Sequence, residues 1–90
     1  KVGLKVARKI ACLAKTIQVL CITHLPQTAC AADRHYQIVK TIANGRTSTK
    51  AVLLNDAQHL DNIAQMISGT EDSKSALTSA KEMRRLVIGR

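Results

Sequence analysis

One short run, Ile-Gln-Val-Leu-Cys-Ile-Thr at residues 17–23, constrains the fold of this chain more than any other feature. The run is almost continuously apolar and rich in β-branched residues, a pattern typical of a strand that is covered on both faces in a parallel α/β sheet. It leads into His24 and Leu25, and Pro26 then suits the first turn of a helix. The sequence therefore predicts an α/β unit with Thr23 and His24 at the carboxyl end of a buried strand, where open α/β sheets bind ligands.

Helices are predicted on both sides of this strand. Residues 2–15 have a helical period, with one apolar side made of Val2, Val6, Ile10, Leu13 and Ala14. A short helix is expected over residues 26–33. Asn55 or Asp56 can cap a helix that runs to Ser68 and stops at Gly69, and a last helix is expected over residues 75–87.

A β-hairpin is predicted between residues 35 and 54, where the apolar period changes to two. Asn44-Gly45 is a strong signal for a two-residue turn. Counting outward from that turn places Ile42 opposite Thr47, Ile38 opposite Ala51, Tyr36 opposite Leu53, and Val39 opposite Lys50. The expected order is therefore helix, strand, short helix, hairpin, helix, helix.

Charge is distributed unevenly along the ninety residues, which carry a formal net charge of +8. Residues 1–50 hold nine bases and one acid, whereas residues 51–90 hold five of each. A blocky basic excess favours a polyanionic partner, and Lys5, Arg8 and Lys9 on the first helix are the candidate contacts to DNA phosphates. Because Tyr36 is the only aromatic residue, base stacking is not expected.

Composition excludes two classes of protein. The 46% apolar content is too high for a disordered basic tail, and no apolar run approaches the roughly 18 residues of a membrane span. Three cysteines without a C-x-x-C pair favour a reducing cytosol. Cys21 and His24 have a C-x-x-H spacing, so a zinc site is an alternative, but buried small cysteines and unrelated histidines are the favoured interpretation.

His24 is the most suggestive chemical group, since a histidine just beyond a buried strand can act as a base or bind phosphate or metal. A loop histidine that satisfies a nearby backbone group is the competing interpretation. The sequence has no G-x-x-x-x-G-K-[ST] loop, because its four glycines are isolated, and it has no apolar strand ending in Asp-Glu. The chain therefore lacks the parts for phosphoryl transfer by itself.

Several motifs together resemble the RecN family, the SMC-like ABC-type ATPases of bacterial DNA double-strand-break repair. The most specific is Thr23-His24-Leu25-Pro26-Gln27, which is preceded by Gln18-Val19-Leu20-Cys21-Ile22 and followed by Ala32-Asp33-Arg34-His35-Tyr36. The resemblance continues through Gly45-Arg46-Thr47-x-Thr49, Ile63-Ala64-x-Met66-Ile67-Ser68-Gly69 and Ala76-Leu77-x-x-Ala80-x-Glu82. It covers essentially the whole chain, with departures at later positions such as His59, where arginine is common in the family.

The resemblance implies that residues 1–90 are one truncated domain, the carboxyl-terminal lobe of an ABC/SMC-type P-loop NTPase head. It implies that the longer parent protein binds ATP and magnesium, pairs two heads as a homodimer and acts on DNA in the cytoplasm, at the nucleoid. By position, His24 would be the switch histidine that approaches the γ-phosphate of ATP. Thr23 and Gln27 would have supporting roles.

Two expectations follow for the chain on its own. It should not hydrolyse ATP or bind a metal, and the strand at 17–23 should favour self-association because its edge lacks a neighbour. A different class of function remains open, a stand-alone small basic DNA-binding or scaffolding module in which the helix at residues 2–15 makes the contacts.

Overall fold

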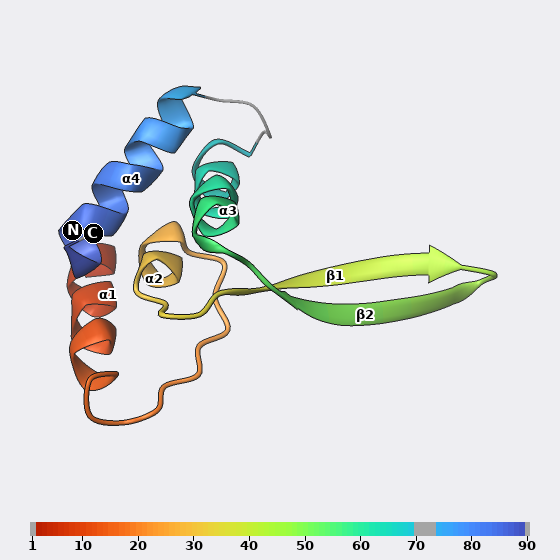
Figure 1. The fold of residues 1–90 in the computed structure, drawn as a ribbon, viewed down its shortest axis with the longest axis horizontal. Helices are drawn as coiled ribbons and strands as arrows, with labels where there is room; N and C mark the ends of the chain where they lie inside the picture. Colours follow the sequence, from red (N-terminus) through yellow and green to blue (C-terminus); the bar gives the residue numbers. More distant parts are fainter. Residues whose placement is uncertain (1, 70–73, 90) are drawn as a thin grey trace.

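The computed structural model describes residues 2–69 and 74–89, which form four helices and one β-hairpin (Figure 1). In chain order the elements are α1 (Val2–Leu13), α2 (Pro26–Cys30), β1 (Tyr36–Ala43), β2 (Arg46–Leu53), α3 (Asp56–Ser68) and α4 (Lys74–Ile88). The helices pack together as a helical body, and the hairpin projects away from it. The described residues are thus a mixture of helix and a two-stranded antiparallel sheet.

The helical body is held together by α2 and α4, each of which contacts the other three helices. Its core consists mostly of alanine, and the largest fully buried side chains among the described residues are Ile63 and Cys30. Small side chains let helices approach closely, and a Cβ at Gly3 of α1 would lie 3.2 Å from Cδ of Gln27 in α2. Among the described residues, the buried hydrophobic set is Ala7, Ala29, Cys30, Ala31, Leu60, Ile63, Ala64, Ala76, Ala80 and Val87.

Helix α1 faces the body with a different side from the one predicted. Ala7 is fully buried and Leu4 and Ala11 pack on the core, whereas Val6 and Leu13 are exposed. The cause is tertiary: α1 packs against α2 and α4 through the side that carries the small residues Gly3, Ala7 and Ala11. Beside this contact, Nε of Arg8 donates to the carbonyl of Leu86 at 2.9 Å. That carbonyl belongs to the last turn of α4, where backbone oxygens have no partner within the helix. The helix also ends at Leu13, two residues before the predicted boundary.

Every residue pair that was predicted for the hairpin is present in the structure. Tyr36 pairs with Leu53, Ile38 with Ala51, Val39 with Lys50, and Ile42 with Thr47. Asn44 and Gly45 both have positive φ, at 52° and 73°, as a tight turn with the twist of a hairpin requires. Every residue of β1 and β2 is exposed, so no helix covers either face.

The predicted strand over residues 17–23 is wrong for this structure, in which that segment forms neither strand nor helix. Its side chains are exposed, with Leu20 at 89% and Ile22 at 100% of their full accessibility. A strand needs backbone partners on a neighbouring strand, and the sheet formed by the described residues contains only β1 and β2. The apolar run is therefore left unpaired, as the long connection between α1 and α2 (Figure 1).

The structure confirms the signals that predicted the ends of α3, and it contains the predicted last helix as α4. The side chain of Asn55 accepts from the backbone N–H of Gln58, and the side chain of Gln58 accepts from the N–H of Asn55, a capping box. Gly69 ends α3 in the left-handed conformation with φ of 74°. Helix α4 extends one residue beyond each predicted end.

Candidate functional site

His24 lies at an exposed bend between the unpaired segment 17–23 and the start of α2. The backbone N–H of Leu25 donates to Oγ1 of Thr23 at 3.0 Å, which closes a short turn around His24. Pro26 follows as the first residue of α2. The imidazole is therefore carried by a locally ordered turn and is accessible to a ligand from outside the chain.

The two predicted supporting residues have structural partners of their own. The hydroxyl of Thr23 is engaged in the turn, and the side chain of Gln27 lies against Gly3 of α1. Gln27 therefore helps to seat α2 on α1. Thr23, His24 and Gln27 thus lie near one another because they are close in the sequence.

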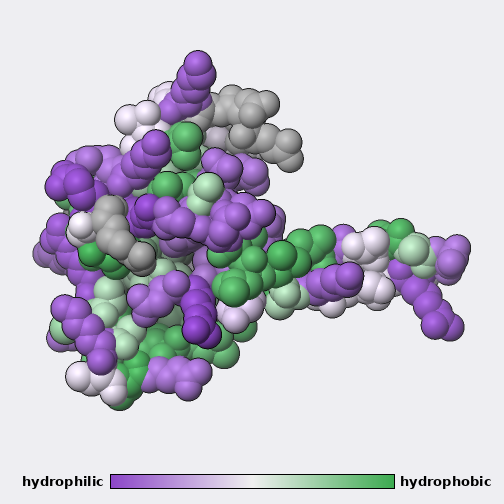
Figure 2. All heavy atoms as spheres, viewed as in Figure 1, coloured by the Kyte–Doolittle hydropathy of each residue, from purple (hydrophilic) through white to green (hydrophobic). Residues whose placement is uncertain are grey.

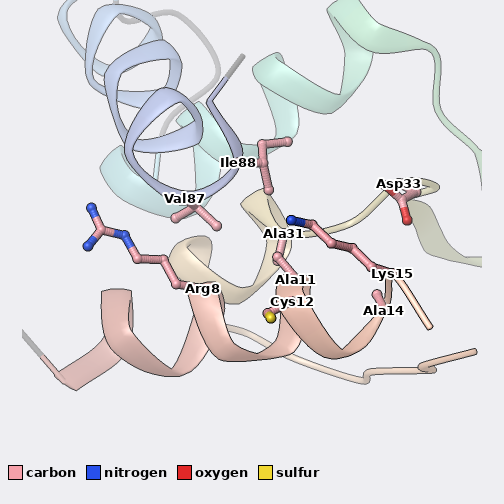
Figure 3. A pocket seen from close by; sticks show the side chains of 9 residues that line it. All are labelled: Arg8, Ala11, Cys12, Ala14, Lys15, Ala31, Asp33, Val87 and Ile88. Carbon is pink, nitrogen blue, oxygen red and sulfur yellow. The ribbon is translucent and has the colours of Figure 1, made fainter. Parts of the chain in front are cut away.

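The predicted basic residues of α1 have different surroundings. Lys5 and Lys9 are exposed, but Arg8 is held by its bond to Leu86 of α4. Arg8 and Lys15 also border an open groove with a cavity volume of about 620 Å³ (Figure 3). The groove lies along α1 and includes the carboxylate of Asp33 as well as the two bases. It is lined by Arg8, Ala11, Cys12, Ala14, Lys15, Ala31, Asp33, Val87 and Ile88.

The cysteines separate into one buried and two exposed thiols. Cys12 and Cys21 are exposed, so the expectation of buried cysteines is wrong for them, whereas Cys30 is buried as expected. Burial raises the pKa of the Cys30 thiol to about 11, an effect opposed in part by the charge of Arg84. In residues 2–69 and 74–89 no cluster of three or more His, Cys, Asp or Glu side chains could hold a metal ion.

Two buried polar residues of the body were not expected from the sequence. Nε2 of His59 donates to the carbonyl of Ala29 at 2.9 Å and so joins α3 to α2. Arg84 of α4 donates through both terminal nitrogens to the carboxylate of Asp56 at the start of α3, at 2.7 and 3.3 Å. Helical spacing puts Arg84 in line with Ala80 and Val87, but a charged residue at such a position is buried only where a partner such as Asp56 meets it.

The hairpin joins the helical body at a pair of histidines. The rings of His35 and His59 meet edge to face with centroids 4.9 Å apart, and the N–H of Leu54 donates to the carbonyl of His35 at 2.9 Å. Nδ1 of His35 is buried without a hydrogen-bond partner. Burial first, and the nearby His59 second, lower the pKa of His35, so the neutral form of this imidazole is favoured at the junction.

No helix among the described residues is long and apolar enough to cross a membrane. No family model matches the chain. Curated proteins do match: the chain is 40% identical over 83 residues to a protein of Bacillus subtilis and 41% identical over 81 residues to one of Deinococcus radiodurans. A protein of Haemophilus influenzae is 37% identical over 75 residues. All three are named DNA repair protein RecN.

These matches cover most of the chain but little of each relative. They include 92%, 90% and 83% of the chain for the three proteins in the order given. The chain spans only 13–14% of the length of these relatives. The resemblance indicated by the Thr-His-Leu-Pro-Gln motif is therefore confirmed, and the chain is a RecN-like sequence that corresponds to one segment of these DNA repair proteins.

Proposed function

We propose that this chain is the carboxyl-terminal lobe of an ABC/SMC-type ATPase head in a RecN-like DNA repair protein, where His24 serves as the switch histidine. The observation that carries the proposal is the 40–41% identity to RecN proteins over nine-tenths of the chain, together with the Thr23-His24 motif within it. The function of the whole protein would be ATP hydrolysis coupled to double-strand-break repair and recombination.

The geometry around His24 supports this role. The segment before it has the composition of a strand covered on both faces, yet Leu20 and Ile22 are almost completely exposed. A longer head would supply neighbouring strands that pair with the backbone of this segment and helices that cover its side chains. His24 would then lie at the carboxyl end of the completed strand, the usual ligand position in such sheets. Thr23 would then orient the turn through its hydroxyl.

The exposed imidazole of His24 fits part of a nucleotide site. An imidazole N–H can donate to a phosphate oxygen and stabilise charge that develops during phosphoryl transfer. ATP would be the substrate, and magnesium would neutralise phosphate charge when bound. The phosphate loop and the magnesium carboxylates would come from other segments of the longer protein, and a second head would close the site. Until covered, the segment at 17–23 would favour self-association.

The proposal is tested in the intact protein by His24→Ala, with Gln18→Ala on the same exposed segment as the matched control. Loss of one donor to the transition state should lower ATP turnover by about 10²-fold, with nucleotide and DNA affinity little changed. An unchanged turnover would remove His24 from the mechanism. ATP turnover by the purified ninety residues, abolished by His24→Ala, would contradict the division of the site between segments.

The alternative of a small basic module is supported by the exposure of Lys5 and Lys9 on α1. Arg8 is better omitted from its test because its substitution would also break the contact with α4. Reversal of Lys5 and Lys9 to Glu should weaken DNA binding and its salt dependence if α1 touches phosphates. Unchanged binding would make this helix face a solvated surface only.

A further inference from the structure

The outer half of the hairpin differs sharply in composition from its base. This arm tip, residues 40–50, carries three bases (Lys40, Arg46 and Lys50) and no acid. It also carries four hydroxyl side chains, at Thr41, Thr47, Ser48 and Thr49. The nearest acids in the sequence, Asp33 and Asp56, lie outside the hairpin. The arm tip is therefore uniformly positive and rich in groups that donate to phosphate oxygens.

The apolar side chains gather instead near the helical body. Tyr36, Ile38, Val39, Val52 and Leu53 are exposed in the inner half of the hairpin, whereas Ile42 is the one large apolar residue of the arm tip. Figure 2 shows the largest hydrophobic area of the hairpin close to the body, whereas the far end is mostly hydrophilic with a smaller hydrophobic area. A protein partner that needs apolar contact would accordingly meet the inner half, and the arm tip suits a polyanion.

The pairing register places positive charge on both faces of the ribbon. Lys40 shares one face with Ile38 and Ile42, while Arg46 and Lys50 belong to the other, opposite Ala43 and Val39. All three bases are exposed. A two-stranded ribbon with its side chains is about 10 Å thick, and the major groove of DNA is about 12 Å wide. A ribbon that enters the groove edge-on would present one basic face to each flanking phosphate backbone.

We propose that the arm tip is a DNA-binding β-ribbon, which contacts the two phosphate backbones of a duplex groove through Lys40, Arg46 and Lys50. The inference rests on the DNA repair function proposed above only for the choice of DNA as the polyanion. The hydroxyls of the arm tip supply further contacts to the phosphate backbones. With no aromatic residue in the arm tip, recognition is by charge and groove shape.

The test compares Lys40→Gln, Arg46→Gln and Lys50→Gln together with a control that removes the same charge elsewhere. The control is Arg34→Gln, Lys74→Gln and Lys81→Gln, three exposed bases outside the hairpin for which no DNA contact is proposed. Binding of the ninety-residue chain to a 20-base-pair duplex is measured by fluorescence anisotropy between 50 and 200 mM salt. Each lost phosphate contact should reduce the salt slope by about 0.9, and the arm variant should lose about 10²-fold in affinity at 0.1 M salt.

Each outcome decides the inference. A loss confined to the arm variant supports it, whereas equal losses in both variants indicate net charge alone and overturn it. Unchanged DNA affinity in the arm variant also overturns it, as does a lack of DNA binding by the unsubstituted chain. If the arm variant changes in sedimentation but not in DNA binding, the arm is assigned to a protein partner. Circular dichroism and hydrogen exchange confirm that the hairpin persists. ATP turnover in the His24 variant is an independent readout, so the proposed function can fail or stand separately.

Discussion

The helical body and the hairpin are held together by different kinds of interaction. The body buries side chains from four helices around Ile63 and Cys30, and it pairs its buried Arg84 with Asp56. In the hairpin every strand residue is exposed, so its order depends on backbone hydrogen bonds and the Asn44-Gly45 turn. Isolated two-stranded hairpins are only marginally stable in water. Global stability should therefore reside in the body, and local opening should begin in the hairpin.

The largest expected effect on stability comes from making the same substitution, Ile→Ala, in each of the two regions. Ile63→Ala removes a fully buried side chain and should lower the free energy of unfolding by about 2–5 kcal/mol through lost burial and a cavity. Ile42→Ala removes an exposed side chain and should change it by no more than about 0.5 kcal/mol. Chemical denaturation followed by circular dichroism measures both. Equal losses would show that the hairpin shares the stabilising core.

The Arg84–Asp56 pair gives the next effect, also within the body. Asp56→Asn leaves a buried guanidinium with weaker partners and should cost about 1–3 kcal/mol. The lower end is expected because the Asp56 side chain is 69% exposed and water can replace part of the contact, whereas the Arg84 side chain is only 10% exposed. Asp61→Asn, an exposed acid on the same helix, is the control in thermal denaturation. Similar melting temperatures for the two variants would contradict a stabilising role for the pair.

The junction between the regions should respond to acid. The folded pKa of His35 is lowered, so its stabilising contribution is fully present above the ordinary value of 6.5 and is lost as the pH falls through the lower folded value. Stability measured between pH 7.5 and 5 should fall, and His35→Gln should reduce the fall because the residue no longer titrates. A pH dependence that is the same in the variant would show that this imidazole is not the group involved.

The smallest effect on global stability is expected from Gly45→Ala, with Gly69→Ala as its matched control. The two glycines have nearly equal φ, at 73° and 74°, and an added Cβ meets no atom of the described residues within 4 Å at either position. Both substitutions therefore impose the same backbone strain, about 1 kcal/mol. Gly45→Ala should speed hydrogen exchange in β1 and β2 and leave the unfolding of the body unchanged, whereas Gly69→Ala should lower the unfolding midpoint. If both substitutions lower the unfolding midpoint, the hairpin and the helical body do not unfold independently.

The elements with local signals could be predicted from the sequence. The turn residues Asn44 and Gly45 fix the hairpin register, because pairing is counted outward from a two-residue loop. Asn55 and Gly69 likewise mark the ends of α3 through hydrogen bonds and φ values that depend only on nearby residues. His24 could be singled out from its motif, and the structure places it at an exposed turn whose closing bond comes from Thr23 and Leu25.

Features that depend on distant partners could not be predicted. Residues 17–23 have the composition of a buried strand, but a strand forms only where another strand pairs with its backbone, and no described strand pairs with this segment. The buried side of α1 depends on α2 and α4, against which it packs, and the helical period of residues 2–15 does not reveal these partners. Arg84 and His59 were left out of the core because their burial depends on Asp56 and on the carbonyl of Ala29.

The sequence by itself thus determined the helices, the hairpin with its register, the basic arm tip and the motif that contains His24. These follow from short-range hydrogen bonds, turn geometry and side-chain order, all of which act between residues close in the chain. Only the tertiary structure decided which face of α1 is buried, which polar groups enter the core and that segment 17–23 lies uncovered. These outcomes depend on pairing between distant residues, since burial of a polar group or an apolar run is favourable only when a partner is in place.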